Sequence, residues 1–192
     1  MFYPESARVP EVLKTDDFLV RPLRATDVER DYDAVISSRA ELWLRNGGKW
    51  PREGFTLEEN LADLLKHERE HLERKAFTYT VMNLAETECL GCIYLNELEP
   101  LLQRFGDRAE EPVEIENYAA WSTFWVRQSH LADNLDARLL QTLLPWFKTE
   151  WAFTRVAFLA RKVQERQIRL FEEAGMRLLS TFPHTLMYVP EP

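Results

Sequence analysis

Cysteine, glycine and long apolar runs are scarce in this chain of 192 residues, which contains two Cys and six Gly. Two cysteines are too few for the disulfide framework of a small secreted domain. No stretch approaches the roughly 18 consecutive apolar residues of a membrane-spanning helix. The first dozen residues lack the basic and apolar regions of a signal peptide. These absences predict a cytoplasmic protein with no membrane partner.

Runs of positive charge are missing as well. The chain has 24 Lys and Arg residues against 32 Asp and Glu residues, which gives a net charge of −8. Because nucleic-acid binding relies on clustered basic side chains, we expect no nucleic-acid partner. A cationic small molecule or a basic peptide would instead feel a mild attraction to this chain.

Hydrophobic side chains, by contrast, make up 45% of the sequence and aromatic ones 12%. Such a composition excludes a disordered chain. At roughly 100–200 residues per domain, the length fits one domain, and no internal repeat is present. We expect a tail over residues 1–16, a single domain over 17–192 and an irregular insertion over 100–113.

Local patterns predict strands and helices that interleave along the chain. Two helices are expected to begin at capping boxes, Thr26 with Glu29 and Thr56 with Glu59. In the second helix, leucines at helical spacing predict a buried stripe. Further helices are expected from residue 135 and over 163–174, and strands over 18–24, 77–84, 90–98, 114–126, 155–160, 176–182 and 184–189. The resulting order, β-α-α-β-β-β-α-β-α-β-β, predicts a layered α/β (α+β) domain with a mixed sheet.

Three segments in this order resemble the GNAT superfamily of acyl-CoA-dependent N-acetyltransferases. FLVRPLRATDVERDY (18–32) is similar to the first strand and helix of the subgroup that includes ribosomal-protein alanine acetyltransferases. FWVRQSHLADNLDARLLQTLLPWF (124–147) is similar to the strand, loop and helix that hold the cofactor, and VQERQIRLFEEAGMR (163–177) resembles the helix that follows. The resemblance implies a mainly antiparallel central sheet flanked by helices, and acetyl-CoA as the donor. It also implies an amine of a small molecule or a peptide N-terminus as the acceptor, and no metal.

In this family the loop after the central strand has the pattern Arg/Gln-x-x-Gly-x-Gly/Ala, and its amide groups face the pyrophosphate. The present chain departs from the pattern, with Leu131 at the first position and Asn134 and Asp136 at the two glycine positions. Asp133 and Asp136 would repel a polyanion, but they also suit the start of a helix as caps. Both interpretations, a diphosphate loop and a helix cap, stay open.

The helix over 163–174 departs from the family as well. Gln164 replaces an Asn, and Phe171 replaces the Tyr that in many members protonates the departing thiolate. A phenyl ring cannot donate that proton. The resemblance nevertheless implies a set of cofactor-binding residues, namely Trp125, Val126, Arg127, Ala132, Asn134, Leu135, Asp136, Gln164 and Phe171.

Catalysis of the implied reaction would need a base for the ammonium and a donor for the oxyanion. Glu97, at the end of an expected strand, is the first candidate base; Glu116 ranks second and Ser122 is a candidate for relaying a proton through water. Backbone N–H groups near Trp125 and Val126 are candidates to polarise the thioester carbonyl.

Other interpretations stay open at this stage. A GNAT-fold protein without catalysis would use the same cleft, or an interface, for binding. His67, Glu70 and His71 match the H-x-x-E-H pattern of zinc hydrolases, although the helical wheel places Glu70 on the solvent side. Cys89 and Cys92 form a lone C-x-x-C without a second pair. The aromatic residues of 121–125 would line a pocket, join the core or form the face of a homodimer.

Overall fold

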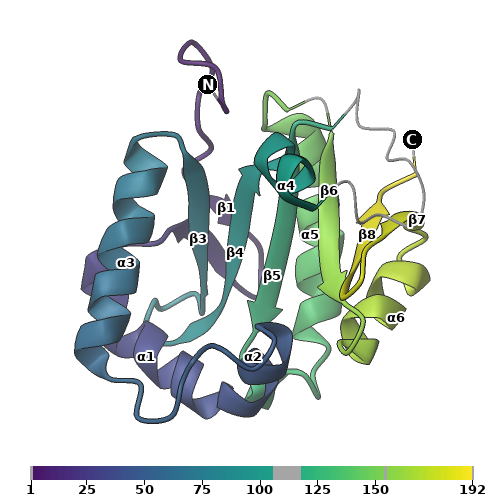
Figure 1. The fold of residues 1–192 in the computed structure, drawn as a ribbon. Coiled ribbons are helices and arrows are strands. Elements are labelled where there is room, and N and C mark those ends of the chain that lie inside the picture. The colour runs from purple at the N-terminus through teal and green to yellow at the C-terminus, as the bar shows by residue number, and fades with distance from the viewer. Residues whose placement is uncertain (1, 106–117, 154, 192) are drawn as a thin grey trace.

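One mixed sheet dominates the computed structural model, which describes residues 2–105, 118–153 and 155–191 (Figure 1). Its strand order is β1-β2-β3-β4-β5-β6-β8-β7, and among the described strands β5 and β6 form the parallel pair. The strands are β1 (Leu13–Lys14), β2 (Leu19–Pro22), β3 (Ala76–Met82), β4 (Cys89–Glu97), β5 (Ala120–Val126), β6 (Val156–Arg161), β7 (Arg177–Thr181) and β8 (Thr185–Val189). The helices are α1 (Val28–Ser37), α2 (Arg39–Arg45), α3 (Leu57–Leu72), α4 (Leu98–Phe105), α5 (Leu135–Thr149) and α6 (Glu165–Glu173). The predicted α/β class with a mainly antiparallel sheet is confirmed.

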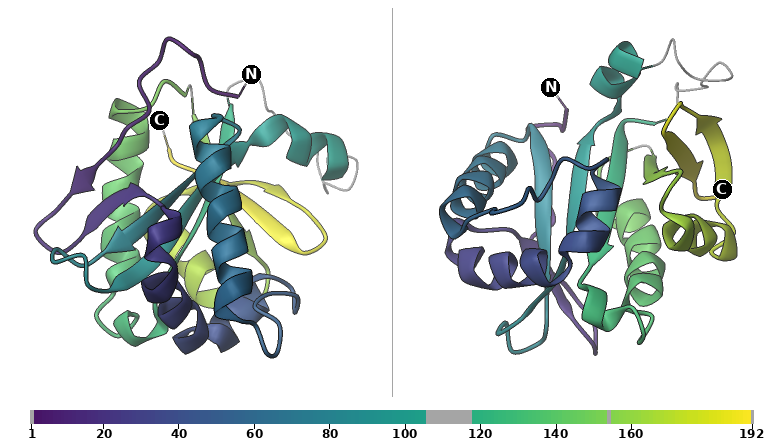
Figure 2. Two further views of the ribbon diagram at one scale, coloured as in Figure 1. Left: turned by 90° about the vertical axis from the view of Figure 1, so that its left-hand side faces the viewer. Right: turned by 60° about the horizontal axis from the view of Figure 1, so that its bottom comes forward.

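Helices cover both faces of this sheet. In Figure 2 (left) the strands lie between α5 on one side and α3 and α4 on the other. Side chains of α5 and α6 join the larger core, whereas those of α1, α2 and α4 join two smaller cores on the opposite face. Each helix therefore buries one side against the sheet, as expected for a layered domain.

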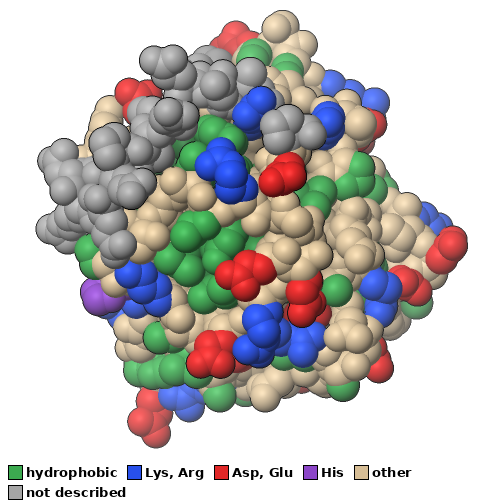
Figure 3. Space-filling view, turned by 90° about the vertical axis from the view of Figure 1, so that its right-hand side faces the viewer, with side chains coloured by type: hydrophobic (Ala, Val, Ile, Leu, Met, Phe, Trp, Pro, Cys, Tyr) green, Lys and Arg blue, Asp and Glu red, His purple; other side chains and the backbone are tan. Residues whose placement is uncertain are grey.

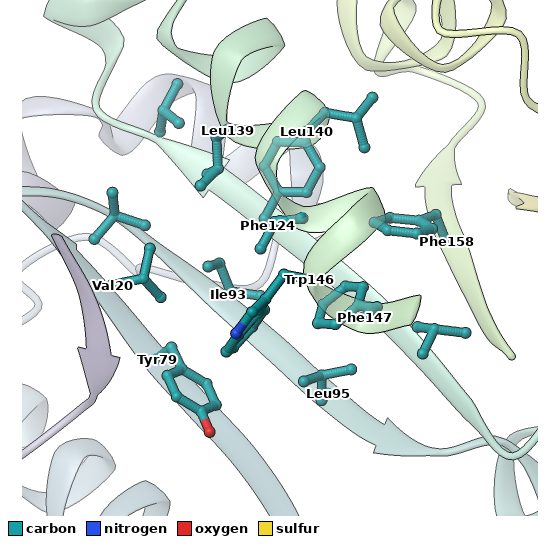
Figure 4. Packing of buried hydrophobic residues seen from close by; sticks show 14 of the residues in the cluster. Val20, Tyr79, Ile93, Leu95, Phe124, Leu139, Leu140, Trp146, Phe147 and Phe158 are labelled. Atoms are coloured by element: carbon teal, nitrogen blue, oxygen red, sulfur yellow. The ribbon is translucent and has the colours of Figure 1, made fainter. Parts of the chain in front are cut away.

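The larger core forms where α5 lies across the central strands. Leu139, Leu140 and Trp146 point from the helix toward Tyr79 and Phe124 on the sheet (Figure 4). Burial of each such side chain contributes about 1.5–3 kcal/mol, so this contact is a major source of stability. It also fixes the start of α5 next to the end of β5.

The two expected capping boxes have different outcomes. At α3, the Thr56 N–H donates to Glu59 Oε2 at 2.9 Å and the Glu59 N–H donates to Thr56 Oγ1 at 3.3 Å, which confirms the second box. The box expected from Thr26 is not formed. There, the buried Asp27 carboxylate instead accepts from the Arg24 N–H and from the Arg21 guanidinium. A buried ion pair thus replaces the predicted cap.

The two segments expected to be irregular are partly ordered. In the N-terminal segment, Tyr3 is fully buried against Phe77 and Trp151, and Leu13–Lys14 forms β1, so residues of the expected tail pack on the domain. Of the expected insertion over 100–113, residues up to 105 belong to α4. The remainder lies outside the described residues.

The surface carries both signs of charge. Figure 3 views the side with α6, β7 and β8, where acidic and basic side chains are interspersed. Among the described helices, none has the length and apolar character required to cross a bilayer.

Candidate functional site

The parallel strands β5 and β6 pair over only three positions. Residues 120–122 of β5 stand opposite residues 156–158 of β6. Beyond them, β5 stays with β4 as far as Val126 and β6 stays with β8 as far as Arg161. The strands therefore separate, and the facing edges of residues 123–126 and 159–161 have no sheet partner among the described residues. We call this opening the notch; its free edges can pair with an extended ligand.

Alternate residues of β5 direct their backbone groups toward β4 and toward the notch. The Arg127 N–H donates to Leu90 O at 2.7 Å on the β4 side, so Trp125 also faces β4. Phe124 and Val126 consequently direct their N–H and C=O groups into the notch. Of the polarising groups expected near Trp125 and Val126, the Val126 N–H has the required direction and the Trp125 N–H does not.

Arg45 of α2 lies at this opening. Its Nη1 donates to Phe124 O at 2.5 Å, and no carboxylate within the described residues pairs with it. Burial lowers the pKa of Arg45 to about 10, so it stays charged at neutral pH. In the turn that follows, a Cβ on Gly47 would stand 2.9 Å from the Arg161 guanidinium of β6. Helix α2 and its turn thus lie against both strands that border the notch.

The loop from β5 to α5 presents free amide groups. The N–H groups of Ala132, Asp133, Leu135 and Asp136 have no acceptor among the described residues. Asn134 adopts a left-handed conformation (φ 54°, ψ 37°), which glycine takes readily and which Asn tolerates better than most residues. The loop therefore keeps a tight turn without glycine, and its amides stand at the positive end of the helix α5 dipole.

Asp136 does not project its charge from this loop. Arg166 of α6 donates to its two oxygens at 2.6 and 2.9 Å, and the Asp136 side chain is only 6% exposed. The same guanidinium also donates to Leu131 O at 2.8 Å and to Asn134 Oδ1 at 3.2 Å. Of the two carboxylates that were expected to repel a polyanion, Asp136 is thus neutralised beneath the loop, whereas Asp133 is exposed. Free amides and a compensated charge fit a diphosphate group.

The remaining candidates for cofactor binding have structural partners. Arg127 pairs with Asp33 at 2.6 Å and with Glu88 at 3.3 Å. Gln164 accepts from the Arg161 N–H at 2.9 Å and so closes the end of β6. The fully buried Phe171 lies among rings of β5, β6 and β8, and has no hydroxyl to offer.

On the opposite face of the sheet, a cavity of about 340 Å³ adjoins β5. Side chains of Trp121, Thr123 and Trp125 line it from β5, and Tyr94 lines it from β4. The Trp125 Nε1–H donates to the Tyr94 hydroxyl at 3.3 Å. Burial raises the pKa of Tyr94 well above its usual value, so this hydroxyl stays protonated.

Helix α3 forms another wall, rotated by about a quarter-turn from the orientation predicted. Asn60, Leu64, His67 and His71 face inward. Of the leucines in the expected buried stripe, Leu64 is buried, and the others are exposed: Leu57, Leu61, Leu65 and Leu72. The inward residues recur at i, i+4, i+7 and i+11, which is also a helical face. The hydrophobic pattern of α3 gives no signal for polar residues, so it did not indicate that Asn60 and its neighbour Asp63 face the cavity.

His67 lines the cavity as a neutral base. Its Nδ1 lies 3.2 Å from Thr78 Oγ1, and its ring lies 5.6 Å from that of Tyr94. Burial lowers the pKa of His67 despite the nearby Glu70 and Asp63 carboxylates, which raise it. It can therefore accept a proton at neutral pH.

The two described candidates for catalysis, Glu97 and Ser122, do not line this cavity. Ser122 is fully buried and alternates with Trp121 and Thr123, so its side chain points to the α5 face. Glu97 stands opposite Ala120, near the end of β5 remote from the notch. Glu116 lies outside the described residues.

Possible metal ligands come together at one place in the described part of the chain. Asp31, Cys89 and Cys92 hold their ligand atoms within 4.8 Å of one another, and all three are buried. A bulge opposite Val81 and Met82 places both cysteines on the same face. Burial raises the pKa of Asp31, and a hydrogen bond with Cys89 together with burial raises that of Cys92. These shifts favour protonated forms, which bind metals poorly. His67, Glu70 and His71 do not form a comparable group among the described residues.

The fold is that of GNAT acetyltransferases. The ribosomal L7/L12 alpha-N-protein acetyltransferase RimL superposes with a TM-score of 0.68 at 16% identity over 98% of both chains. The ribosomal-protein-S5-alanine acetyltransferase from Vibrio fischeri superposes with a TM-score of 0.68 at 13% identity, over 94% of this chain and 96% of that one. The microcin C7 self-immunity acetyltransferase MccE, solved with acetyl-CoA and AMP, gives 0.71 at 11% identity, over 96% and 98%. No family model and no curated protein matches the sequence.

Proposed function

We propose that this chain transfers an acetyl group from acetyl-CoA to a primary amine. The supporting observation is that β5 borders two sites at once. The backbone of Phe124 and Val126 faces the notch, while the side chains of Trp121, Thr123 and Trp125 face the cavity. A donor in the notch and an acceptor in the cavity would meet at this strand.

On the donor side, the notch offers free strand edges for an extended arm, and the amides of residues 132–136 suit a diphosphate. Val126, Arg127, Ala132, Asn134, Leu135 and Asp136 would then hold acetyl-CoA, with Arg166 compensating Asp136. The RimL and MccE structures with bound CoA and acetyl-CoA support this assignment for the fold.

On the acceptor side, the amine attacks the thioester carbonyl, a C–N bond forms and the C–S bond breaks. The Val126 N–H and the Arg45 guanidinium are the donors placed to polarise the carbonyl. His67, a neutral imidazole in the cavity, would take the ammonium proton. Because Phe171 cannot donate a proton, the departing thiolate either stays unprotonated or takes a proton from water.

The test is acetyl transfer from radiolabelled acetyl-CoA to a panel of small amines and peptides. We expect the wild type to label at least one amine. Thr123→Phe should fill the cavity without entering the notch, so it should abolish labelling and retain acetyl-CoA binding. Thr149→Phe, an exposed position at the end of α5, is the matched control and should leave labelling unchanged.

Two results would overturn the proposal. Wild-type protein that binds acetyl-CoA and labels no amine would be a binding protein without catalysis. Equal labelling by the wild type and Thr123→Phe would place the acceptor outside the cavity.

A further inference from the structure

We propose that the cavity selects acceptors that carry a second cationic group, such as a short diamine, and that Asp63, Asn60 and Asp31 bind this group. The inference rests on the proposed function and specifies its substrate class. It depends on the part of the cavity that α1 and α3 line.

Asn60 is the first reason. It is 1% exposed and lines the cavity, yet its Oδ1 has no hydrogen-bond partner among the described residues. Its Nδ2 donates to Asp31 Oδ2 at 2.9 Å and contacts Val28 O at 3.4 Å, which fixes the orientation of the amide. A buried acceptor without a donor is costly, and a ligand N–H would satisfy it.

The second reason is a pair of carboxyl groups, those of Asp31 and Asp63, that have no basic partner. Asp31 and Asp63 both line the cavity, and no Lys or Arg of the described residues forms an ion pair with either. Lys66 also lines the cavity, but its Nζ pairs with Glu70 Oε1 at 3.8 Å and not with either aspartate. Burial raises the pKa of Asp31, as expected for a carboxyl that lacks a cation. An ammonium group would supply that charge.

The two ends of the cavity differ in charge, which orients the acceptor. Arg45 is the cation at the β5 end, where it donates to Phe124 O. Its charge disfavours a second cation beside it and so favours the deprotonated form of an amine there. The distal ammonium then lies with the carboxylates, and the neutral amine lies at the notch.

The walls and the size of the cavity fit a small organic cation. Trp50 and Trp121 line it, and Trp50 Nε1 donates to Asp63 Oδ2 at 3.2 Å, which leaves the other oxygen of Asp63 for a ligand. Aromatic faces attract ammonium groups. The volume of about 340 Å³ is at the lower end of the range for small-molecule sites, which is roughly 300–1,000 Å³.

The experiment compares 1,4-diaminobutane with 1-aminopentane, which has a similar length and one amine. We expect kcat/KM for the diamine to exceed that for the monoamine by about tenfold or more, as for a charge-assisted hydrogen bond. Asp63→Asn should remove most of this preference by lowering kcat/KM for the diamine. Glu58→Gln, an exposed change of equal charge on the same helix, should preserve the preference. A dipeptide with an N-terminal lysine tests whether a basic peptide is preferred to the diamine.

Quenching of tryptophan fluorescence by each amine gives a readout that does not depend on acetyl transfer. Diamine binding that Asp63→Asn weakens, without any acetylation, would contradict the proposed function and support this specificity. Acetylation of both amines with equal kcat/KM, or no effect of Asp63→Asn, would overturn the specificity and leave the acetyltransferase proposal standing. Better acetylation of the lysyl dipeptide than of the diamine would support the need for a second cationic group and identify a basic peptide as the acceptor.

Discussion

Arg166 of α6 holds both carboxylate oxygens of Asp136 in the first turn of α5, at 2.6 and 2.9 Å. The pair joins two helices at the loop where the resemblance places the diphosphate of the donor. It explains how an acidic residue can occupy a position that the family gives to glycine or alanine. The charge of Asp136 is matched within the protein before any ligand arrives.

Removal of Arg166 should therefore weaken acetyl-CoA binding. In Arg166→Gln, Asp136 stays charged but loses its partner, so we expect the Kd for acetyl-CoA to rise about tenfold, as measured by isothermal titration calorimetry. Arg169→Gln is the control, since Arg169 pairs with Glu165 on the exposed face of the same helix. Equal Kd values for the two variants would contradict this role of the pair.

The orientation of α3 can be checked with neighbouring leucines. Leu64 is 2% exposed and Leu65 is 51% exposed. Leu64→Ala should lower the free energy of unfolding by about 2–4 kcal/mol because it creates a cavity. Leu65→Ala should change it by less than about 0.5 kcal/mol. Both values come from urea denaturation. A larger loss for Leu65→Ala would show that the leucine stripe faces the core, as the sequence pattern predicted.

Acid should destabilise the fold through His71. Burial lowers its pKa to about 4, and a hydrogen bond to Thr78 O opposes this only in part. The unfolded chain takes up this proton near pH 6.5 and the folded chain only near pH 4. The contribution of His71 to the free energy of unfolding is fully present above pH 6.5. It is lost as the pH falls toward 4, by at most about 3 kcal/mol.

The measurement is urea denaturation between pH 7 and pH 4. His71→Leu should flatten the dependence of unfolding free energy on pH in this window. His184→Leu, at an exposed position in the turn between β7 and β8, should retain the wild-type slope. Identical slopes in all three proteins would show that His71 does not cause the dependence.

The two cysteines should be unreactive in the folded protein. Cys89 and Cys92 are both buried, and the pKa of Cys92 is raised by its hydrogen bond with Cys89 and by burial. The thiolate is the reactive form, so a disulfide reagent should modify neither thiol in buffer and both in guanidinium chloride. Rapid stoichiometric labelling of both thiols in the native protein would mean that the buried group of Asp31, Cys89 and Cys92 opens to solvent.

Much of the order of elements could be predicted from sequence because most strands and helices carry a local signal, but the short elements β1, α2 and α4 were not predicted. Periodicity and the Thr56 capping box gave the correct element types. The Thr26 box failed because the buried Arg21 and Asp27 form a competing ion pair, which depends on β2 lying beside the start of the helix. Such a contact between distant residues leaves no local signal.

The site was harder to predict than the fold. The loop of residues 131–136 was located by its resemblance to a known motif, but the partner of Asp136 lies on another helix. Trp121 and Trp125 line the cavity, as one of the three interpretations of the aromatic residues in 121–125 expected. Asn60 and Asp63 were missed because the leucines of α3 gave the stronger periodic signal. That helix exposes four leucines and buries an asparagine and two histidines in part, a departure from the usual pattern that is expected at functional sites.

Hydrogen exchange with and without acetyl-CoA tests the central claim, that the notch and the adjacent loop bind the donor. The decisive amides are those of Phe124 and Val126 in the notch and of residues 132–136 in the loop. We predict that saturating acetyl-CoA slows their exchange by about tenfold or more, while Trp125, which faces β4, changes little. Unchanged exchange in both segments at millimolar acetyl-CoA would contradict the account.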